Sequence, residues 1–174
     1  MSRKALLVID MLKDFLDPAG ALYCGDEARR IISPLNNLLA KFRRSKEVII
    51  FLTDSHKPDD KEFEMFAPHC ITGTAGADII PEIKVNEGEY LVPKTRFSAF
   101  YGTDLDKILE KEDVSEVHVS GVCTSICVME TVSDLRNRDY PVVVHENTVA
   151  DFDPEAHEYA LKRMKSILGA RIEP

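Results

Sequence analysis

The chain has 174 residues, a formal net charge of −8 and 44% hydrophobic residues. A chain of this length and composition is typical of a globular protein with one core, not of a disordered or low-complexity protein. The negative charge opposes the approach of nucleic acid phosphates. We therefore expect one domain spanning residues 1–174 that does not bind nucleic acid.

The apolar run nearest the N-terminus covers only residues 5–9. It is too short for the core of a secretion signal and far too short to span a bilayer, so we expect a cytoplasmic protein that makes no membrane contact. Without an export signal, the cysteines are expected to remain thiols, and one of them is a candidate nucleophile. The four cysteines are Cys24, Cys70, Cys123 and Cys127.

Short apolar runs alternate with amphipathic stretches along the chain, which predicts an α/β fold. We expect a three-layer sandwich, with a mainly parallel central sheet and helices on both faces. The predicted strands cover residues 5–9, 48–52, 90–92, 117–119 and 142–144, with a last strand near 170–172.

Apolar residues at helical spacing predict helices over residues 31–42, 105–109, 125–135 and 154–168. Pro34 is expected to begin or kink the first of these helices. Asp153 is the expected N-cap of the last helix, with Pro154 at its first position and Gly169 at its end.

Ligands of open α/β sheets bind outside the carboxyl ends of the strands, so the residues that follow each apolar run are functional candidates. Asp10 follows the first run, Asp54 and His56 follow the second, and Lys94 follows the third. Cys127 ends the polar segment after the fourth run. We expect an acid, a pair of metal-ligand types, a cation and a thiol to meet at one edge of the sheet.

Cys127 is predicted to lie in the first turn of a helix, where unpaired N–H groups and the helix dipole favour a thiolate. Lys94 would lower the pKa of this thiol further, and Asp10 could take a proton and return it to a leaving amine. Taken alone, each residue has an ordinary explanation as a buried cysteine, a solvated lysine or a turn-forming aspartate. Their coincidence at three strand ends favours a catalytic site.

Several local motifs occur in a characteristic order. They are Leu-Val-Ile-Asp at 7–10 with Phe15 after it, Thr-Asp-Ser-His at 53–56, Phe-Ala-Pro-His at 66–69, Lys-Thr-Arg-Phe at 94–97 and Gly-Val-Cys-Thr-Ser-Ile-Cys at 121–127. In this order the chain resembles, over nearly its whole length, the isochorismatase-like cysteine hydrolases, and within them the nicotinamidases.

The resemblance implies a catalytic triad of Asp10, Lys94 and Cys127. It also implies a cis peptide bond between Val122 and Cys123, which places the backbone N–H groups of Cys123 and Cys127 as an oxyanion hole. The implied reaction is amide hydrolysis through a thioester of the cysteine.

The resemblance further implies a divalent metal ion, zinc or else manganese or iron, held by Asp54, His56 and His69. Many nicotinamidases carry one more histidine ligand, and residues 57–66 contain none. Some place a glutamate seven residues before the last histidine, and Glu62 has this spacing from His69. We therefore predict Glu62 as the fourth ligand. Its rivals in the same loop are Asp59, Asp60 and Glu64, and the loop acids could also all be solvated.

The implied substrate is a small aromatic amide, nicotinamide, whose hydrolysis to nicotinate and ammonia belongs to NAD salvage. Phe15, Phe66 and Phe97 match positions that form an aromatic wall, and the family favours homo-oligomers. One alternative is another small-amide or carbamoyl amidohydrolase of the same family. Alternatives of a different class are a thiol redox protein that uses Cys123 and Cys127, or a non-catalytic module.

Overall fold

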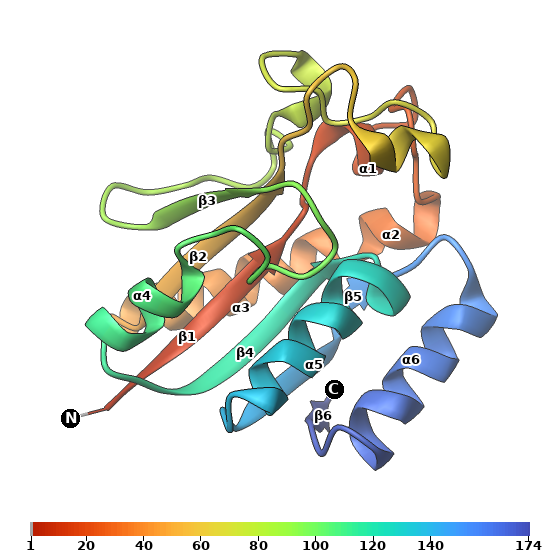
Figure 1. Cartoon of the computed structure of the whole chain (residues 1–174). Helices are drawn as coiled ribbons and strands as arrows, with labels where there is room; N and C mark the ends of the chain where they lie inside the picture. The colour runs from red at the N-terminus through yellow and green to blue at the C-terminus, as the bar shows by residue number, and fades with distance from the viewer. Residues whose placement is uncertain (1) are drawn as a thin grey trace.

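Six parallel strands form the centre of the computed structural model, which describes residues 2–174 (Figure 1). The strands are β1 (Arg3–Ile9), β2 (Val48–Asp54), β3 (Tyr90–Lys94), β4 (Val114–Val122), β5 (Val142–Ala150) and β6 (Arg171–Glu173). Their order across the sheet is β3-β2-β1-β4-β5-β6, and every neighbouring pair is parallel. The strand order reverses between β1 and β4, and such a reversal point opens a crevice in which α/β proteins bind ligands.

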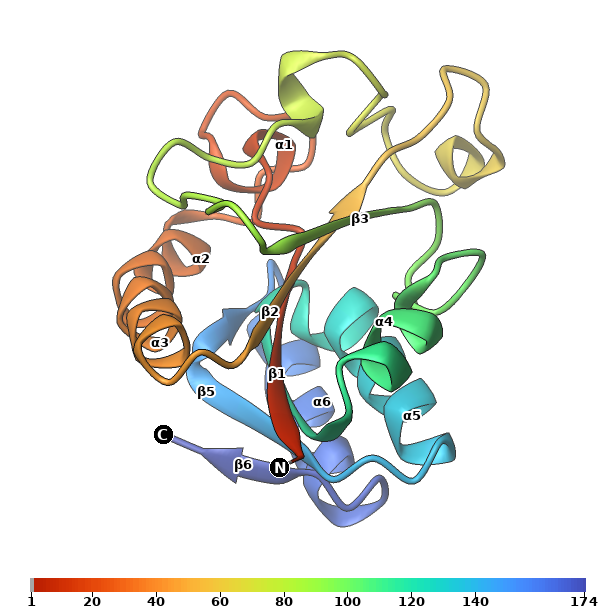
Figure 2. The same cartoon turned by 90° about the vertical axis from the view of Figure 1, so that its left-hand side faces the viewer.

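Helices cover both faces of the sheet, as Figure 2 shows. The helices are α1 (Lys13–Leu16), α2 (Asp26–Arg30), α3 (Ile32–Arg44), α4 (Leu105–Lys111), α5 (Met129–Asn137) and α6 (Pro154–Ser166), with short turns η1 (Lys61–Glu64), η2 (Ala75–Ala77) and η3 (Thr124–Val128). α2 and α3 lie on one face, and α4, α5 and α6 lie on the other. The predicted three-layer α/β fold is therefore confirmed, and its sheet is parallel throughout.

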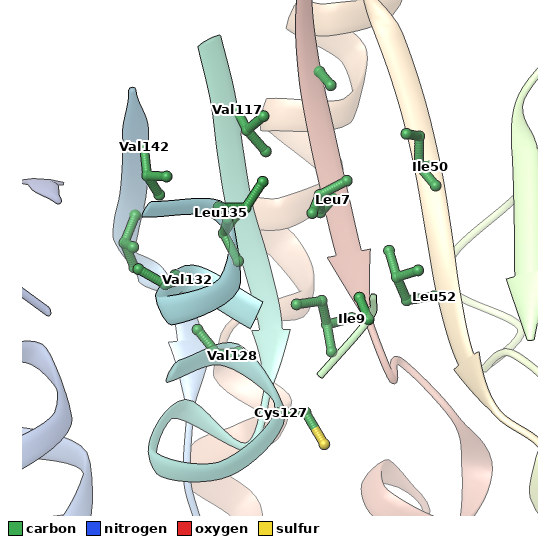
Figure 3. Packing of buried hydrophobic residues seen from close by; sticks show 14 of the residues in the cluster. Leu7, Ile9, Ile50, Leu52, Val117, Cys127, Val128, Val132, Leu135 and Val142 are labelled. Atoms are coloured by element: carbon green, nitrogen blue, oxygen red, sulfur yellow. The ribbon is translucent and has the colours of Figure 1, made fainter. Parts of the chain in front are cut away.

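The apolar run of β1 is buried because successive side chains point to opposite faces of the sheet and both faces are covered. Leu7 and Ile9 belong to the core cluster on the α5 side, where Val128 and Val132 pack (Figure 3). Leu6 and Val8 belong to the second cluster, beneath α3. This burial on both faces explains why the run reads as continuous apolar sequence.

The ends of the helices test the predicted N-cap of the last helix and the predicted role of Pro34. The Asp153 side chain accepts hydrogen bonds from the backbone N–H groups of Glu155 (2.9 Å) and Ala156 (3.3 Å), so the predicted N-cap of α6 is confirmed. Pro34 does not begin α3, because it is the third residue of that helix. Proline is tolerated in a first turn, where its missing N–H would have no partner within the helix. α1 and α2 were not predicted, because four or five residues are too few to show a helical period.

The long segment between β2 and β3 passes over the carboxyl ends of the strands, next to α1 (Figure 1). It carries η1 and η2 and holds the motif residues of positions 55–69 above the sheet. Among residues 2–174, no helix combines the length and the apolar character that crossing a bilayer requires.

Gly121 lies at the end of β4, directly opposite Ile9 of β1. Its φ is +113°, a region that other residues rarely adopt, and a Cβ atom placed there would lie 1.9 Å from the carbonyl oxygen of Ile9. The two backbones can therefore run side by side up to the strand ends only because this residue has no side chain.

We predict that Gly121→Ala lowers the free energy of unfolding by about 2–4 kcal/mol, because it adds both backbone strain and a clash with a strand. Chemical denaturation measures this loss. Gly88→Ala is the matched control, since Gly88 also has a positive φ (+86°) but open space around it, and should cost about 1 kcal/mol. Equal losses in the two variants would show that the approach to Ile9 is not what requires glycine.

Candidate active site

The carboxyl ends of three neighbouring strands bring the predicted acids and the lysine together. Asp54 and Lys94 are direct partners in the register of β2 and β3. Asp10 follows β1, and its backbone N–H donates to the carbonyl of Leu52 at 2.9 Å. Its φ of +53° lies in the left-handed region, which aspartate tolerates better than most residues. The chain thus turns sharply at Asp10 while its carboxylate stays beside β2.

Lys94 lies at the centre of the site and is 1% exposed. Its Nζ lies 2.8 Å from Asp10 Oδ2, 2.5 Å from Asp54 Oδ1 and 3.5 Å from Cys127 Sγ. Asp10 Oδ1 also accepts a hydrogen bond from the backbone N–H of Asp54, at 2.9 Å. The structure therefore brings Asp10, Lys94 and Cys127 together, as the sequence predicted.

The protonation states of this group follow from burial and mutual charge. Burial favours the neutral form of Lys94, yet Asp10, Cys127 and Asp54 together hold the pKa of its ammonium well above the usual value. Burial, helped by the Asp54 charge and opposed by Lys94, raises the pKa of Asp10 to about 6. Burial also acts to raise the pKa of Asp54, but the ammonium of Lys94 and the nearby imidazoles of His56 and His69 lower it below its ordinary range. At neutral pH the site therefore holds one ammonium between two carboxylates.

The structure bears out the predicted place of Cys127 but not the predicted lowering of its thiol pKa. Cys127 lies in η3, a π-type turn that runs directly into α5 and forms the first turn of this helical segment. Burial raises the pKa of its thiol well above the usual value, and the opposing effect of Lys94 is smaller. The thiol is therefore neutral at rest. Its Sγ and a carboxylate oxygen of Asp10 lie within 4.8 Å of each other, so Asp10 is placed to take its proton.

The loop that carries the nucleophile is held by its own backbone. The Val122–Cys123 peptide bond is cis, as the family resemblance implied. The carbonyl of Cys123 accepts hydrogen bonds from the N–H groups of Ile126 and Val128, both at 3.1 Å. These contacts fix the backbone between Cys123 and Cys127, the two predicted oxyanion donors.

The redox alternative required Cys123 and Cys127 to act as a pair. The Cys123 sulfur instead faces Cys24, with the two Sγ atoms 3.4 Å apart. The hydrogen bond to Cys24 and burial raise the pKa of the Cys123 thiol well above its usual value. All four cysteines are free thiols, as predicted.

A second cluster lies on the other side of Asp54. Asp54, His56, Glu62 and His69 are all buried, and each offers one ligand atom within 4.8 Å of the others. His69 Nε2 lies 3.8 Å from Asp54 Oδ2 and 3.7 Å from Glu62 Oε1, and His56 Nε2 lies 3.7 and 3.9 Å from the same two atoms. Glu62 is 5% exposed, whereas Asp59 and Glu64 are exposed.

This cluster fits a divalent cation. His56 Nε2 and Glu62 Oε2 are buried and have no hydrogen-bond partner among the described residues. Buried polar atoms without partners are costly, and a cation would satisfy both atoms at once. Two imidazoles and two carboxylates are a ligand set that zinc, manganese and iron accept.

A cavity of about 330 Å³ opens next to both clusters. Cys127 is one of the residues that line it, and Figure 3 shows Cys127 beside the ends of β1 and β4. Phe15, Phe66 and Phe97 line it as predicted, and the rings of Phe66 and Phe97 meet edge to face with centroids 6.2 Å apart. The remaining lining residues are Leu22, Tyr23, Cys24, Asp54, Glu62, His69, Val122, Cys123, Ile126 and Phe152. A mostly apolar pocket of this size suits a small ring compound.

Some residues that support the site were not predicted from the sequence. Asp14 Oδ2 accepts a hydrogen bond from the N–H of Cys70 at 2.7 Å, which ties α1 to the loop of His69. Asp151 Oδ2 accepts one from the N–H of Ser125 at 2.7 Å, in the nucleophile loop. Acidic residues are common in loops, so the sequence alone does not distinguish Asp14 and Asp151 from solvated acids. Only the hydrogen bonds that they make in the folded chain do so.

Comparison with known proteins places this site in a family. A model of the isochorismatase domain matches residues 4–173. The chain belongs to the isochorismatase family. The chain is therefore a hydrolase of this family.

Three solved structures resemble this isochorismatase-family chain closely. A nicotinamidase/pyrazinamidase from Bacillus subtilis is 38% identical, with 99% of this chain and 100% of that chain covered and a TM-score of 0.93. A pyrazinamidase from Pyrococcus horikoshii in complex with zinc is 32% identical, covers 98% of both chains and has a TM-score of 0.92. An N-carbamoylsarcosine amidase from Thermoplasma acidophilum is 33% identical, covers 98% of this chain and 95% of that chain, and has a TM-score of 0.90.

We predict that Glu62→Ala lowers metal content and raises KM for an amide substrate, because it removes one of four ligands. Metal analysis of the purified protein and steady-state kinetics measure the two effects. Glu64→Ala is the matched control, since Glu64 lies two residues further along the same turn but is exposed. Equal metal content and kinetics in both variants would leave a three-ligand site.

Proposed function

We propose that this chain is a nicotinamidase, which hydrolyses nicotinamide to nicotinate and ammonia through a thioester on Cys127. The observation that carries the proposal is the position of Lys94. Its ammonium contacts Asp10, Cys127 and Asp54, and so joins a nucleophile and its base to the cation-binding cluster. This junction lies beside an aromatic cavity that suits a single ring.

The substrate ring would lie among Phe15, Phe66 and Phe97, with its amide carbonyl next to Cys127. We propose zinc, or else manganese or iron, as the ion held by Asp54, His56, Glu62 and His69. When bound, the ion would supply a Lewis acid for the ring nitrogen of the substrate. A ring held at both ends presents its amide in one orientation, which favours reaction at that carbon.

The first half of the reaction breaks the amide bond. As Cys127 Sγ attacks the carbonyl carbon, its proton moves to the Asp10 carboxylate. The carbonyl oxygen gains the negative charge and accepts hydrogen bonds from the N–H groups of Cys123 and Cys127. The C–N bond then breaks, and Asp10 gives its proton to the leaving nitrogen, which departs as ammonia. A thioester on Cys127 remains.

The second half releases the acid. Asp10, again a carboxylate, takes a proton from a water molecule whose oxygen attacks the thioester carbonyl. The C–S bond breaks, the proton returns to the sulfur, and nicotinic acid leaves and loses its own proton to solvent to become nicotinate. Lys94 stays an ammonium throughout, since its pKa lies well above the usual value, and its charge stabilises the sulfur anion when the proton has left.

The alternative within the family is an amidohydrolase of carbamoyl compounds or of other small amides. The four-ligand cluster and the aromatic wall support an aromatic amide that carries a ring nitrogen. Homo-oligomers remain an expectation from the family resemblance.

Ammonia release by the purified protein tests the proposal. Nicotinamide should be turned over faster than benzamide, which lacks the ring nitrogen, and faster than N-carbamoylsarcosine, which lacks the ring. Faster turnover of the carbamoyl compound would favour the alternative, and no turnover of any of the three would favour a non-catalytic module.

We predict that Cys127→Ala abolishes ammonia release while metal content stays near that of the unchanged protein, because the substitution removes only the nucleophile. Cys123→Ala is the control and should be far milder, since alanine still supplies the backbone N–H proposed for the oxyanion. Retained turnover in Cys127→Ala would overturn the mechanism, and an equally inactive Cys123→Ala would revive a two-thiol mechanism.

We also predict that Asp10→Asn lowers kcat by about 100-fold or more, the usual contribution of a general acid and base. The amide keeps the shape and can still accept the hydrogen bond from the Asp54 N–H, but it cannot take the thiol proton. Steady-state ammonia assays at fixed metal concentration measure the loss. A rate within a few-fold of the unchanged protein would remove Asp10 from the proton transfers.

A further inference from the structure

We propose that Asp60 is a positioning residue, whose single carboxylate orients both His56 and Glu62 toward the cation and is itself held by Arg96. This inference rests on the proposed metal site. The sequence offered Asp60 only as a rival ligand to Glu62, and the structure assigns it a different place, behind the ligands.

His56 is oriented through its outer nitrogen. Its Nδ1 lies 3.2 Å from Asp60 Oδ2, while its Nε2 lies inside the cluster without a hydrogen-bond partner. A proton on Nδ1 that is donated to Asp60 leaves the lone pair on Nε2, which is the form of histidine that binds a metal. His69 follows the same arrangement, because its Nδ1 lies 2.8 Å from the carbonyl oxygen of Ala67. Both imidazoles thus turn Nε2 inward.

Glu62 is positioned through its backbone. Its N–H donates to Asp60 Oδ1 at 2.9 Å, so that Asp60 is the N-cap of η1, the turn that carries Glu62. The two oxygens of one carboxylate therefore hold two neighbouring ligands, one by its ring and the other by its main chain. A shift of Asp60 would move both ligands together.

Arg96 holds the carboxylate from the third side. Its Nη1 lies 3.0 Å from Asp60 Oδ1 and 3.2 Å from Oδ2. The carbonyl oxygen of Arg96 accepts a hydrogen bond from Lys94 Nζ at 3.2 Å. The loop after β3 thus contacts Asp60, behind the metal cluster, through the side chain of Arg96, and it contacts Lys94 through the main chain of Arg96. The side chain of Asp60 is only 9% exposed, and so it is shielded from water where it meets His56.

Removal of such an outer partner of a ligating histidine commonly lowers metal affinity by about 10–100-fold. We therefore expect Asp60→Ala to weaken Zn²⁺ and Mn²⁺ binding by that factor, measured on metal-free protein by competition with a chromogenic chelator. Asp60→Asn should recover part of the affinity, because its amide oxygen can still accept a hydrogen bond from the Nδ1–H group of His56. Asp59→Ala is the matched control from the same loop, where the side chain is exposed.

Kinetics separate positioning from direct catalysis. Excess metal should restore most of the nicotinamide turnover of Asp60→Ala, as long as the thermal unfolding of the metal-free variant matches that of the unchanged protein. The same treatment should not restore Cys127→Ala.

The inference is overturned if Asp60→Ala binds Zn²⁺ as tightly as the unchanged protein, or if Asp59→Ala loses as much affinity. It is also overturned if Asp60→Asn is no better than Asp60→Ala. If the unchanged protein binds no divalent cation, both the role of Asp60 and the metal site of the proposed function are overturned. If the unchanged protein binds Zn²⁺ without hydrolysing nicotinamide, the affinity comparison still decides the role of Asp60.

Discussion

The ammonium of Lys94 is buried between the carboxylates of Asp10 and Asp54, and the rest of the site depends on this arrangement. A buried ammonium without partners would be costly, and so would two buried carboxylates that face each other without a cation between them. Each charge is therefore tolerated because of the others. The same ammonium lies 3.5 Å from the sulfur of Cys127, so one cation links the nucleophile, its base and the first residue of the metal cluster.

The parallel sheet makes this grouping possible. Parallel strands end at the same edge, and the register of β2 and β3 places Asp54 directly beside Lys94. The order of the strands reverses between β1 and β4, and the proposed base and nucleophile follow these two strands. Gly121 lets the two strands run close together at this point, because a side chain there would meet the carbonyl of Ile9.

The fold and the reactive residues could be predicted from the sequence because both are indicated by short stretches of consecutive residues. Continuous apolar runs identify parallel strands, and the residues after each run lie at one edge whatever the details of packing. The state of the thiol could not be predicted in this way. Burial and the neighbouring carboxylates of Asp10 and Asp54 raise the pKa of the thiol, and neither effect has a local signal in the sequence.

The supporting residues were missed for a related reason. Asp60 and Asp14 have their roles only through partners that the fold brings to them, such as His56 for Asp60 and the N–H of Cys70 for Asp14. In the sequence both are ordinary acids of polar segments. Glu62 was distinguished from its neighbours by its spacing from His69, and its burial next to His69 now supports that choice.

The central claim is that Cys127 forms a thioester beside the Lys94 ion cluster. Mass spectrometry of protein that is quenched in acid during turnover of nicotinamide tests it most directly. The account predicts that the protein gains the mass of one nicotinoyl group, that digestion locates the group on Cys127, and that Cys127→Ala gains none. Turnover without any adduct, or an adduct on Cys24 or Cys123, would contradict it.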